Sequence, residues 1–301
     1  MNTSEPIETG FSEKRTTTSA QRLLRGLQRF PIHLLVIIIC VIWFIPTLGL
    51  LVSSFRPANL VATTGWWTAF TGPFKFTLDL YRQALTTSNM GMSFINSLFI
   101  AIPGTVVPIM IAAFAAYAFA WMDFPGRNLL FVIVVGLLVV PLQMTLIPVL
   151  RLYNRLGLTG TFLGIWLAHT GYGLPFAIYL LRNFFGTLPR DLFESAALDG
   201  ASQFTTFFRL VIPLSIPALA SLAIFQFMWV WNDLLVALVY LGGTPTVAPM
   251  TVTISQLVSS LGGGWQVLTA AAFISMMLPL VIFFSLQRYF VRGILAGSVK
   301  G

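Results

Sequence analysis

The most concentrated group of polar side chains lies between two apolar stretches, from Glu194 to Ala201, where the sequence reads Glu-Ser-Ala-Ala-Leu-Asp-Gly-Ala. The carboxylates of Glu194 and Asp199 can accept hydrogen bonds and pair with cations. The small residues around them allow another surface to approach closely. The chemistry offered here is recognition, although two carboxylates near the end of a helix can also be plain solvated charges.

The residues around this segment predict a helix from Arg190 to Leu198. Pro189 suits the first position of a helix, and the acidic Asp191 and Glu194 favour its positive amino-terminal end. Gly200 can adopt the left-handed conformation that closes a helix. The sequence therefore predicts a short polar helix that ends at glycine.

A second helical piece is predicted to follow the first. Ser202 is a good amino-terminal cap, and the piece runs through Phe204, Phe207 and Phe208 to Pro213. We expect its phenylalanines to anchor the loop against the apolar part of the protein.

The composition places these short helices beside a membrane. The 301 residues have a mean hydropathy of +0.87, and 57% of them are hydrophobic while only 9% are charged. Soluble domains carry roughly 25% charged residues. Because an ionisable group at the bilayer centre costs at least about 2.5 kcal/mol, the gaps between charges locate the spans of an integral membrane protein.

Six transmembrane helices are predicted from these gaps. Each gap can hold a helix of roughly 20 residues. The gaps are bounded by Arg29 and Arg56, Arg82 and Asp123, Arg127 and Arg151, Arg155 and Arg182, Arg209 and Asp233, and Asp233 and Arg288. Glycine-rich and proline-containing breaks at 242–245 and 262–264 leave the last span at 266–286.

Lysine and arginine are distributed unevenly between the two sides, and this bias sets the orientation. Twelve of the 17 basic residues lie in the two tails and in the loops that contain Arg127 and Arg190, and five lie on the opposite side. Both termini are therefore expected in the cytoplasm. The inside-facing arginines account for most of the net charge of +8, so no nucleic-acid partner is expected.

The expected organisation has five parts. They are a cytoplasmic amino-terminal tail (1–30), a first transmembrane anchor (31–55), an external loop with an interfacial segment (56–92), a core bundle of five helices (93–286) that includes the polar loop 182–210, and a cytoplasmic carboxyl-terminal tail (287–301). Aromatic residues typical of the headgroup level occupy the external loop: Trp66, Trp67, Phe70, Phe74 and Phe76. Prolines within spans two to six favour helices that bend around a path, although such kinks also serve packing.

The polar loop, continued by Leu210-Val211-Ile212-Pro213, closely resembles the EAA loop of permease subunits of binding-protein-dependent ATP-binding-cassette (ABC) importers. Ser195 stands where a second small residue is usually alanine, and Leu210 and Ile212 stand where the family prefers isoleucine and leucine. Other segments resemble the carbohydrate branch of the maltose-permease type: Phe184-Phe185 with Pro189, Trp231-Asn232-Asp233, and Gln287 to Gly293 followed by Gly297, Lys300 and Gly301.

This resemblance implies an all-α integral membrane protein with the six-helix type I importer permease fold and a cytoplasmic coupling helix. It implies that the ATPase is contacted through the loop by Glu194, Ala196, Ala197, Asp199, Gly200, Ala201 and Pro213, and through the tail by Gly297, Lys300 and Gly301. The implied partners are a second, homologous permease in a heterodimer, two cytoplasmic ATPase chains, an external sugar-binding protein and membrane lipid. The implied location is the bacterial inner membrane, and the implied solute is a small sugar such as an α-glucoside or another di- or oligosaccharide.

Six residues are candidates for the path of that sugar: Trp229, Asn232, Asp233, Tyr172, Phe176 and Phe225. The four aromatic rings could stack on a sugar or simply pack the bundle. Asp233 could line the path or an external gate, or it could pair with an arginine near the interface.

Two other classes of protein remain as alternatives. A membrane-embedded enzyme would need acids, histidines or cysteines clustered at one face, and an ion-coupled secondary transporter would use buried ionisable groups along its path. The chain has few of either. His33 and His169 are solitary, so no metal site is expected. No Gly-Lys pair is present to cradle a phosphate, so we expect no cofactor and no enzyme activity on this chain, with ATP hydrolysis on a separate subunit.

Overall fold

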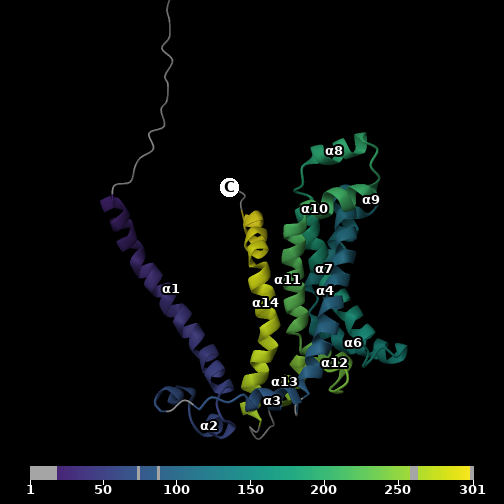
Figure 1. Ribbon diagram of the computed structural model, residues 1–301. Coiled ribbons are helices and arrows are strands. Elements are labelled where there is room, and N and C mark those ends of the chain that lie inside the picture. The colour runs from purple at the N-terminus through teal and green to yellow at the C-terminus, as the bar shows by residue number, and fades with distance from the viewer. Residues whose placement is uncertain (1–18, 73–74, 87–88, 258–263, 299–301) are drawn as a thin grey trace, which may run out of the picture. The chain divides into compact units, whose positions relative to one another are not determined.

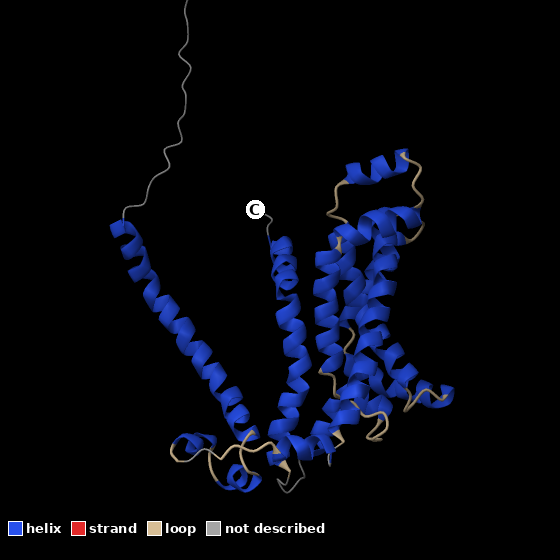
Figure 2. Cartoon of the chain, in the orientation of Figure 1, coloured by secondary structure: helices blue, strands red, loops and turns tan. Residues whose placement is uncertain are grey.

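The computed structural model describes residues 19–72, 75–86, 89–257 and 264–298, and within these ranges all regular structure is helical (Figure 2). The α-helices are α1 (Ser19–Ser54), α2 (Ala58–Thr63), α3 (Asp79–Thr86), α4 (Met90–Trp121), α5 (Arg127–Gly136), α6 (Leu142–Leu156), α7 (Phe162–Phe185), α8 (Arg190–Leu198), α9 (Gln203–Thr206), α10 (Ile212–Leu214), α11 (Ile216–Trp231), α12 (Leu235–Leu241), α13 (Met250–Leu257) and α14 (Trp265–Ser298). Tighter or wider turns form η1 (Trp66–Phe70), η2 (Leu137–Val139) and η3 (Phe207–Val211).

The chain divides into two compact units, residues 1–50 and 51–301. The first unit contains most of α1, whose stretch Phe30–Ser54 is long and apolar enough to cross a membrane. The helix begins at Ser19, so it also includes residues that we expected in the amino-terminal tail.

The second unit is a helical bundle built around α4 and α7, which pack along each other. Helix α11 packs against both of them, and α14 packs against α11 (Figure 1). Helix α8 lies at one end of this bundle, and α3, α12 and α13 lie at the other end (Figure 1). The bundle therefore separates the polar loop from the loop that was predicted to be external.

Fewer helices than the predicted six meet the length and apolarity of a membrane span. In the described part of the chain three single helices meet them, and up to five spans result if each of two bent helix pairs counts as one. The bent pairs are Arg127–Val139 with Leu142–Leu156, at 101°, and Gln203–Leu214 with Ile216–Trp231, at 75°.

The predicted fourth span corresponds to α7, which is not among those helices. Its 24 residues give a length of about 36 Å at 1.5 Å per residue, enough for a hydrocarbon core of about 30 Å. Its centre, however, carries His169 and Thr170, which lower the mean hydropathy. Both side chains are buried in the bundle, so they need no lipid-compatible surface.

Two of the three hydrophobic clusters in the bundle include residues of α4, at different positions along the helix. One contains Ile100 and Ala101, and the other begins at Ala112. Between them lies a polar layer, formed by Thr105 of α4, His169 of α7 and Gln226 of α11, all of which are buried. Gln226 joins the layer by donating a hydrogen bond from Nε2 to the carbonyl oxygen of Gly104 at 3.1 Å.

The loop after α1 is organised by a buried arginine. Arg56 is 4% exposed, and its guanidinium donates to the Gly65 carbonyl at 3.0 Å and to the hydroxyls of Thr64 and Thr68 at 2.7 and 3.0 Å. These bonds close the chain around η1, where Trp67 and Phe70 are exposed. Exposed aromatic rings fit the interfacial role that we expect of this loop, while Phe74 lies outside the described residues.

Replacing Arg56 by lysine is expected to loosen the segment 64–71. Lysine keeps the positive charge but cannot reach three acceptors with a planar fork, and a hydrogen bond to a charged group contributes about 2 kcal/mol. Local opening should then make amide hydrogen exchange in this segment roughly 30-fold faster. The matched control is Arg82→Lys, because Arg82 is exposed. Equal exchange in the two variants would contradict the role of Arg56.

Candidate functional site

Helix α8 has the bounds that the sequence predicts, Arg190 to Leu198. Pro189 immediately precedes the helix instead of occupying its first position. At the other end Gly200 has φ +72°, its N–H donates to the Ala197 carbonyl at 3.0 Å, and the N–H of Ala201 donates to the Ala196 carbonyl at 2.9 Å. This pair of bonds around a left-handed glycine is the Schellman motif, so the predicted closure by Gly200 is confirmed.

Most of α8 is presented to its surroundings. None of its residues is buried, and Leu198 is 89% exposed. Glu194, Ala197 and Asp199 are exposed as well, and Ala196 is partly covered. An exposed leucine beside two carboxylates forms a mixed apolar and acidic surface, which suits contact with another protein.

The second helical piece is only partly as predicted. Ser202 caps α9 by accepting a hydrogen bond from the N–H of Thr205 at 3.2 Å, as expected. Phe207 is buried, but Phe204 and Phe208 are 71% and 55% exposed, so one phenylalanine of the three anchors the loop in the core.

A sharp bend separates this piece from α11. The helix path passes through the π-turn η3 and the short α10 before it turns by 75° at Ser215. Pro213 lies in the first turn of α10 and is exposed. A wide turn followed by proline explains the bend, since each interrupts the regular ladder of backbone hydrogen bonds.

Four of the six path candidates line one cavity of about 290 Å³ between α7 and α11. Its walls are made of Tyr172, Gly173, Phe176, Phe225, Gln226 and Trp229. The lining contains aromatic faces and one carboxamide but no charged side chain. A cavity of this kind can bind an uncharged ligand that offers both apolar faces and hydrogen-bonding groups.

We did not predict from the sequence that Gly173 and Gln226 line this cavity. A Cβ atom added to Gly173 would lie 2.5 Å from Nε2 of Gln226, so the glycine is needed for the close approach of α7 and α11. The signal for Gln226 was present in the sequence, since an amide inside the apolar run of α11 requires a partner within the bundle.

Asn232 and Asp233 do not line this cavity, and their assignment to the sugar path stays a prediction. The carboxylate of Asp233 accepts hydrogen bonds from the N–H groups of Val236 and Ala237 at 3.2 and 2.9 Å, and so caps α12. Its Oδ2 also lies 3.8 Å from Nε2 of His169. Asn232 donates back to the Met228 carbonyl at 2.8 Å. Both side chains therefore shape the end of α11 and the start of α12.

Tyr172 is fixed in the cavity wall by neighbouring hydroxyls. Thr145 of α6 donates to its hydroxyl at 2.9 Å, and the hydroxyls of Tyr172 and Tyr240 lie 2.7 Å apart. Tyr240 belongs to α12, the helix that Asp233 caps. The cavity wall is thus tied to α6 and to α12.

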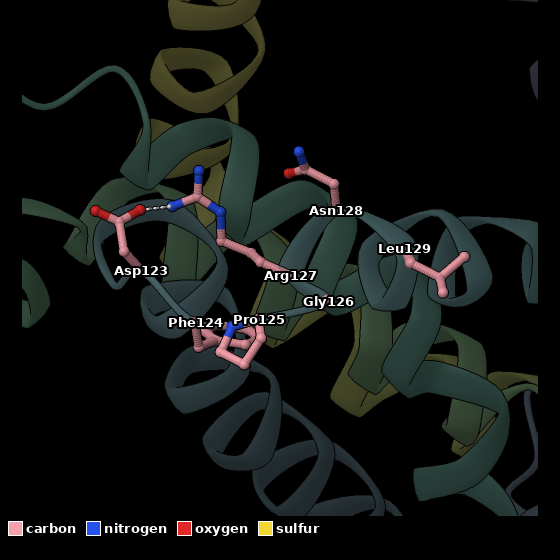
Figure 3. A pocket seen from close by; sticks show the side chains of 7 residues that line it. All are labelled: Asp123, Phe124, Pro125, Gly126, Arg127, Asn128 and Leu129. Atoms are coloured by element: carbon pink, nitrogen blue, oxygen red, sulfur yellow. Dashed lines mark hydrogen bonds and ion pairs between the residues drawn. The ribbon is translucent and has the colours of Figure 1, made fainter.

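Another recess, of about 470 Å³, lies at the turn between α4 and α5 (Figure 3). Seven consecutive residues, from Asp123 to Leu129, line it, so no distant parts of the chain converge there. Its ion pair joins Nη1 of Arg127 to Oδ1 of Asp123 at 2.8 Å, and the Asp123 side chain is 98% exposed. Because an exposed pair contributes little, we assign no site to this recess.

The tail residues are only partly described. Helix α14 continues to Ser298, so the backbone of Gly297 is helical in the segment that we expected as a tail. Lys300 and Gly301 lie outside the described residues. Within the described chain, no group of three or more His, Cys, Asp or Glu residues could hold a metal ion.

Known proteins are similar to this chain in sequence and in fold. The model of a family described as binding-protein-dependent transport system inner membrane component matches residues 13–296. The osmoprotective compounds uptake permease protein of Synechocystis sp. is 61% identical, over 96% of this chain and 98% of that protein. The α-glucoside transport system permease protein of Rhizobium meliloti is 43% identical, over 90% and 97%.

Among solved structures, this chain is similar to a chain of a bacterial ABC transporter involved in the import of the acidic polysaccharide alginate. The TM-score is 0.73, with 21% identity, and the match covers 91% of this chain and 99% of that one. At this identity the likeness shows a shared fold.

Substitution of Gly173, the glycine in the cavity wall, tests how closely α7 packs on α11. Gly173→Ala should lower the free energy of unfolding by about 1–3 kcal/mol, because overpacking displaces the Gln226 amide. Gly171→Ala is the matched control, since nothing lies within 4 Å of an added Cβ there. Thermal unfolding in detergent should show a lower Tm for Gly173→Ala alone. Equal Tm values for the two variants would contradict the close approach.

Proposed function

We propose a solute-translocating role for this chain, which belongs to the family of binding-protein-dependent transport system inner membrane components, as the polar loop predicts. In this role the chain is the permease subunit of an ABC importer and carries no ATPase site of its own. The observation that carries the proposal is α8, a capped helix that lies beyond one end of the bundle with Leu198 almost fully exposed.

The proposed solute is an uncharged sugar or a sugar-like osmoprotectant. The cavity between α7 and α11 supports this, because aromatic faces stack on sugar rings and the Gln226 carboxamide can bond a hydroxyl. The names of the two relatives, one for osmoprotective compounds and one for α-glucosides, point to the same class. No charged side chain lines the cavity to neutralise an acidic sugar.

The proposed energy source is a cytoplasmic ATPase that binds α8. Glu194, Ala197, Asp199 and Leu198 offer it a mixed surface, while Gly200 fixes the chain direction at the end of the helix. Burial of one leucine side chain contributes about 1.5–3 kcal/mol, so Leu198 alone can contribute substantially to this contact. Ala196, Ala201 and Pro213 complete the proposed coupling loop, and Gly297, Lys300 and Gly301 are proposed as a further contact.

The proposed assembly contains this chain, a second homologous permease, two ATPase chains and an external binding protein. The chain crosses the inner membrane six times, with both termini in the cytoplasm. The bias of lysine and arginine supports this orientation, and the placement of α8 and α3 at opposite ends of the bundle agrees with it.

Uptake into vesicles that contain the reconstituted assembly tests the proposed function. With ATP inside and the binding protein outside, we expect uptake of an α-glucoside and none of a sugar acid of similar size. Uptake of the acid at the same rate would contradict the role of the uncharged cavity.

Gly200→Val is expected to abolish ATP-dependent uptake while the protein stays in the membrane. Valine in the left-handed region costs about 1–2 kcal/mol, and relief of that strain would redirect the end of α8. Gly200→Asn is the matched control, because asparagine tolerates this conformation, and it should retain uptake. Normal uptake by the valine variant would refute coupling through α8.

Glu194→Lys is expected to weaken the ATPase contact. Unpairing a charge at an interface costs about 2–5 kcal/mol, so less ATPase should co-purify with the variant. Asp123→Lys provides a control at another exposed carboxylate. If both variants retain the ATPase equally well, Glu194 is a solvated charge.

A further inference from the structure

We propose that Phe193 of α8 and Trp121 of α4 form the contact through which movement of α8 reaches the bundle. This inference rests on the proposed function. That proposal has the ATPase contact α8, and this one concerns how α8 contacts the bundle. Phe193 and Trp121 are positioning residues, since neither lines the cavity.

Helix α8 is attached to the bundle by few side chains. Phe193 is its one residue that packs against the hydrophobic cluster of α4, α7 and α11. The neighbouring Leu192 and Leu198 are exposed. A force applied to α8 by a partner must therefore pass along the backbone at the two ends of the helix or through the Phe193 ring.

Trp121 offers that ring a fixed surface. The centroids of the two rings lie 3.6 Å apart with an angle of 16° between their planes. The indole N–H of Trp121 donates to the carbonyl oxygen of Phe185 at 3.0 Å, and the Phe185 side chain is fully buried at the end of α7. The indole is held at its edge by α7, which leaves its face for Phe193.

The same face of α4 holds the rest of the loop. Tyr117, one turn before Trp121, donates from its hydroxyl to Oε1 of Gln203 at 2.5 Å. Phe114 stacks on Phe207 with ring centroids 4.6 Å apart. Positions 114, 117 and 121 share one side of a helix. Three parts of the loop, α8, α9 and η3, thus contact one helix that is not adjacent to the loop in sequence.

Nearer its middle, α4 is hydrogen-bonded to a residue that lines the cavity. The carbonyl of Gly104 accepts the hydrogen bond from Gln226, which lines the cavity. From Gly104 to Trp121 the helix extends about 26 Å at 1.5 Å per residue. A displacement of the Trp121 end is therefore passed to the Gln226 amide by one continuous helix.

The test is the number of solute molecules taken up per ATP hydrolysed by the reconstituted assembly. Phe193→Ala should lower this ratio at least about fivefold, the lower range of coupling between distant sites, while the ATPase chains still co-purify. Phe193→Tyr keeps the stacked ring and should retain the ratio. Phe204→Ala, at a phenylalanine of the same loop that is 71% exposed, is the matched control and should leave the ratio unchanged.

Trp121→Ala should reproduce the loss, and the double variant with Phe193→Ala should lose no more than either single variant, because the two rings form one contact. An unchanged ratio in Phe193→Ala would overturn the inference. So would a double variant whose loss of the ratio equals the product of the two single losses, or loss of the ATPase chains from the Phe193→Ala assembly. A wild-type assembly that takes up no solute with ATP would contradict the proposed function itself. A working wild type with an equally coupled Phe193→Ala contradicts only this inference.

Discussion

A buried side-chain amide needs a hydrogen-bond partner inside the bundle, and much of the structure depends on how this constraint is met at Gln226. The amide of Gln226 in α11 meets it at the carbonyl of Gly104 in α4. The bond requires close approach at two glycines, since a side chain at Gly173 would strike the amide and one at Gly104 would press on Val230. The close contact among α4, α7 and α11 and the cavity beside Gln226 are therefore parts of one arrangement.

The local features of the polar loop could be predicted from sequence because they depend on local chemistry. Gly200 and Ser202 act through backbone bonds to residues a few positions away, so the bounds of α8 and the cap of α9 follow from residue type. The family could also be predicted, since Glu194 to Ala201 carries a specific spacing. The coupling role of these residues stays a prediction.

Features that depend on tertiary contacts could not be predicted in the same way. The sequence marks Asp233 as a carboxylate near a membrane, but only the path of the chain shows that it caps α12. Likewise α7 is less apolar than a typical membrane span. The sequence alone does not show that its polar residues His169 and Thr170 are buried in the bundle, away from lipid. The exposure of Phe204 and Phe208 also depends on how the loop packs on the bundle, which residue type alone does not show.

The protein combines a tightly packed bundle with a loosely attached helix. Most of the side-chain packing lies along α4, α7 and α11, whereas α8 is exposed and joins the bundle at Phe193. Such a division suits a permease whose energy comes from outside, because a partner can move α8 without unpacking the core. Helix α4 then connects the two, with the loop contacts at one end and the polar layer nearer its middle.

The central claim, that an ATPase seats on α8, is tested most directly by site-specific photocrosslinking in the intact membrane. A crosslinking amino acid is placed at Leu198, which is 89% exposed, and separately at Trp67, which is 61% exposed in the loop at the other end of the bundle. We predict a covalent adduct with the co-expressed ATPase chain from position 198 and none from position 67. Adducts of equal yield from both positions, or from position 67 alone, would contradict it.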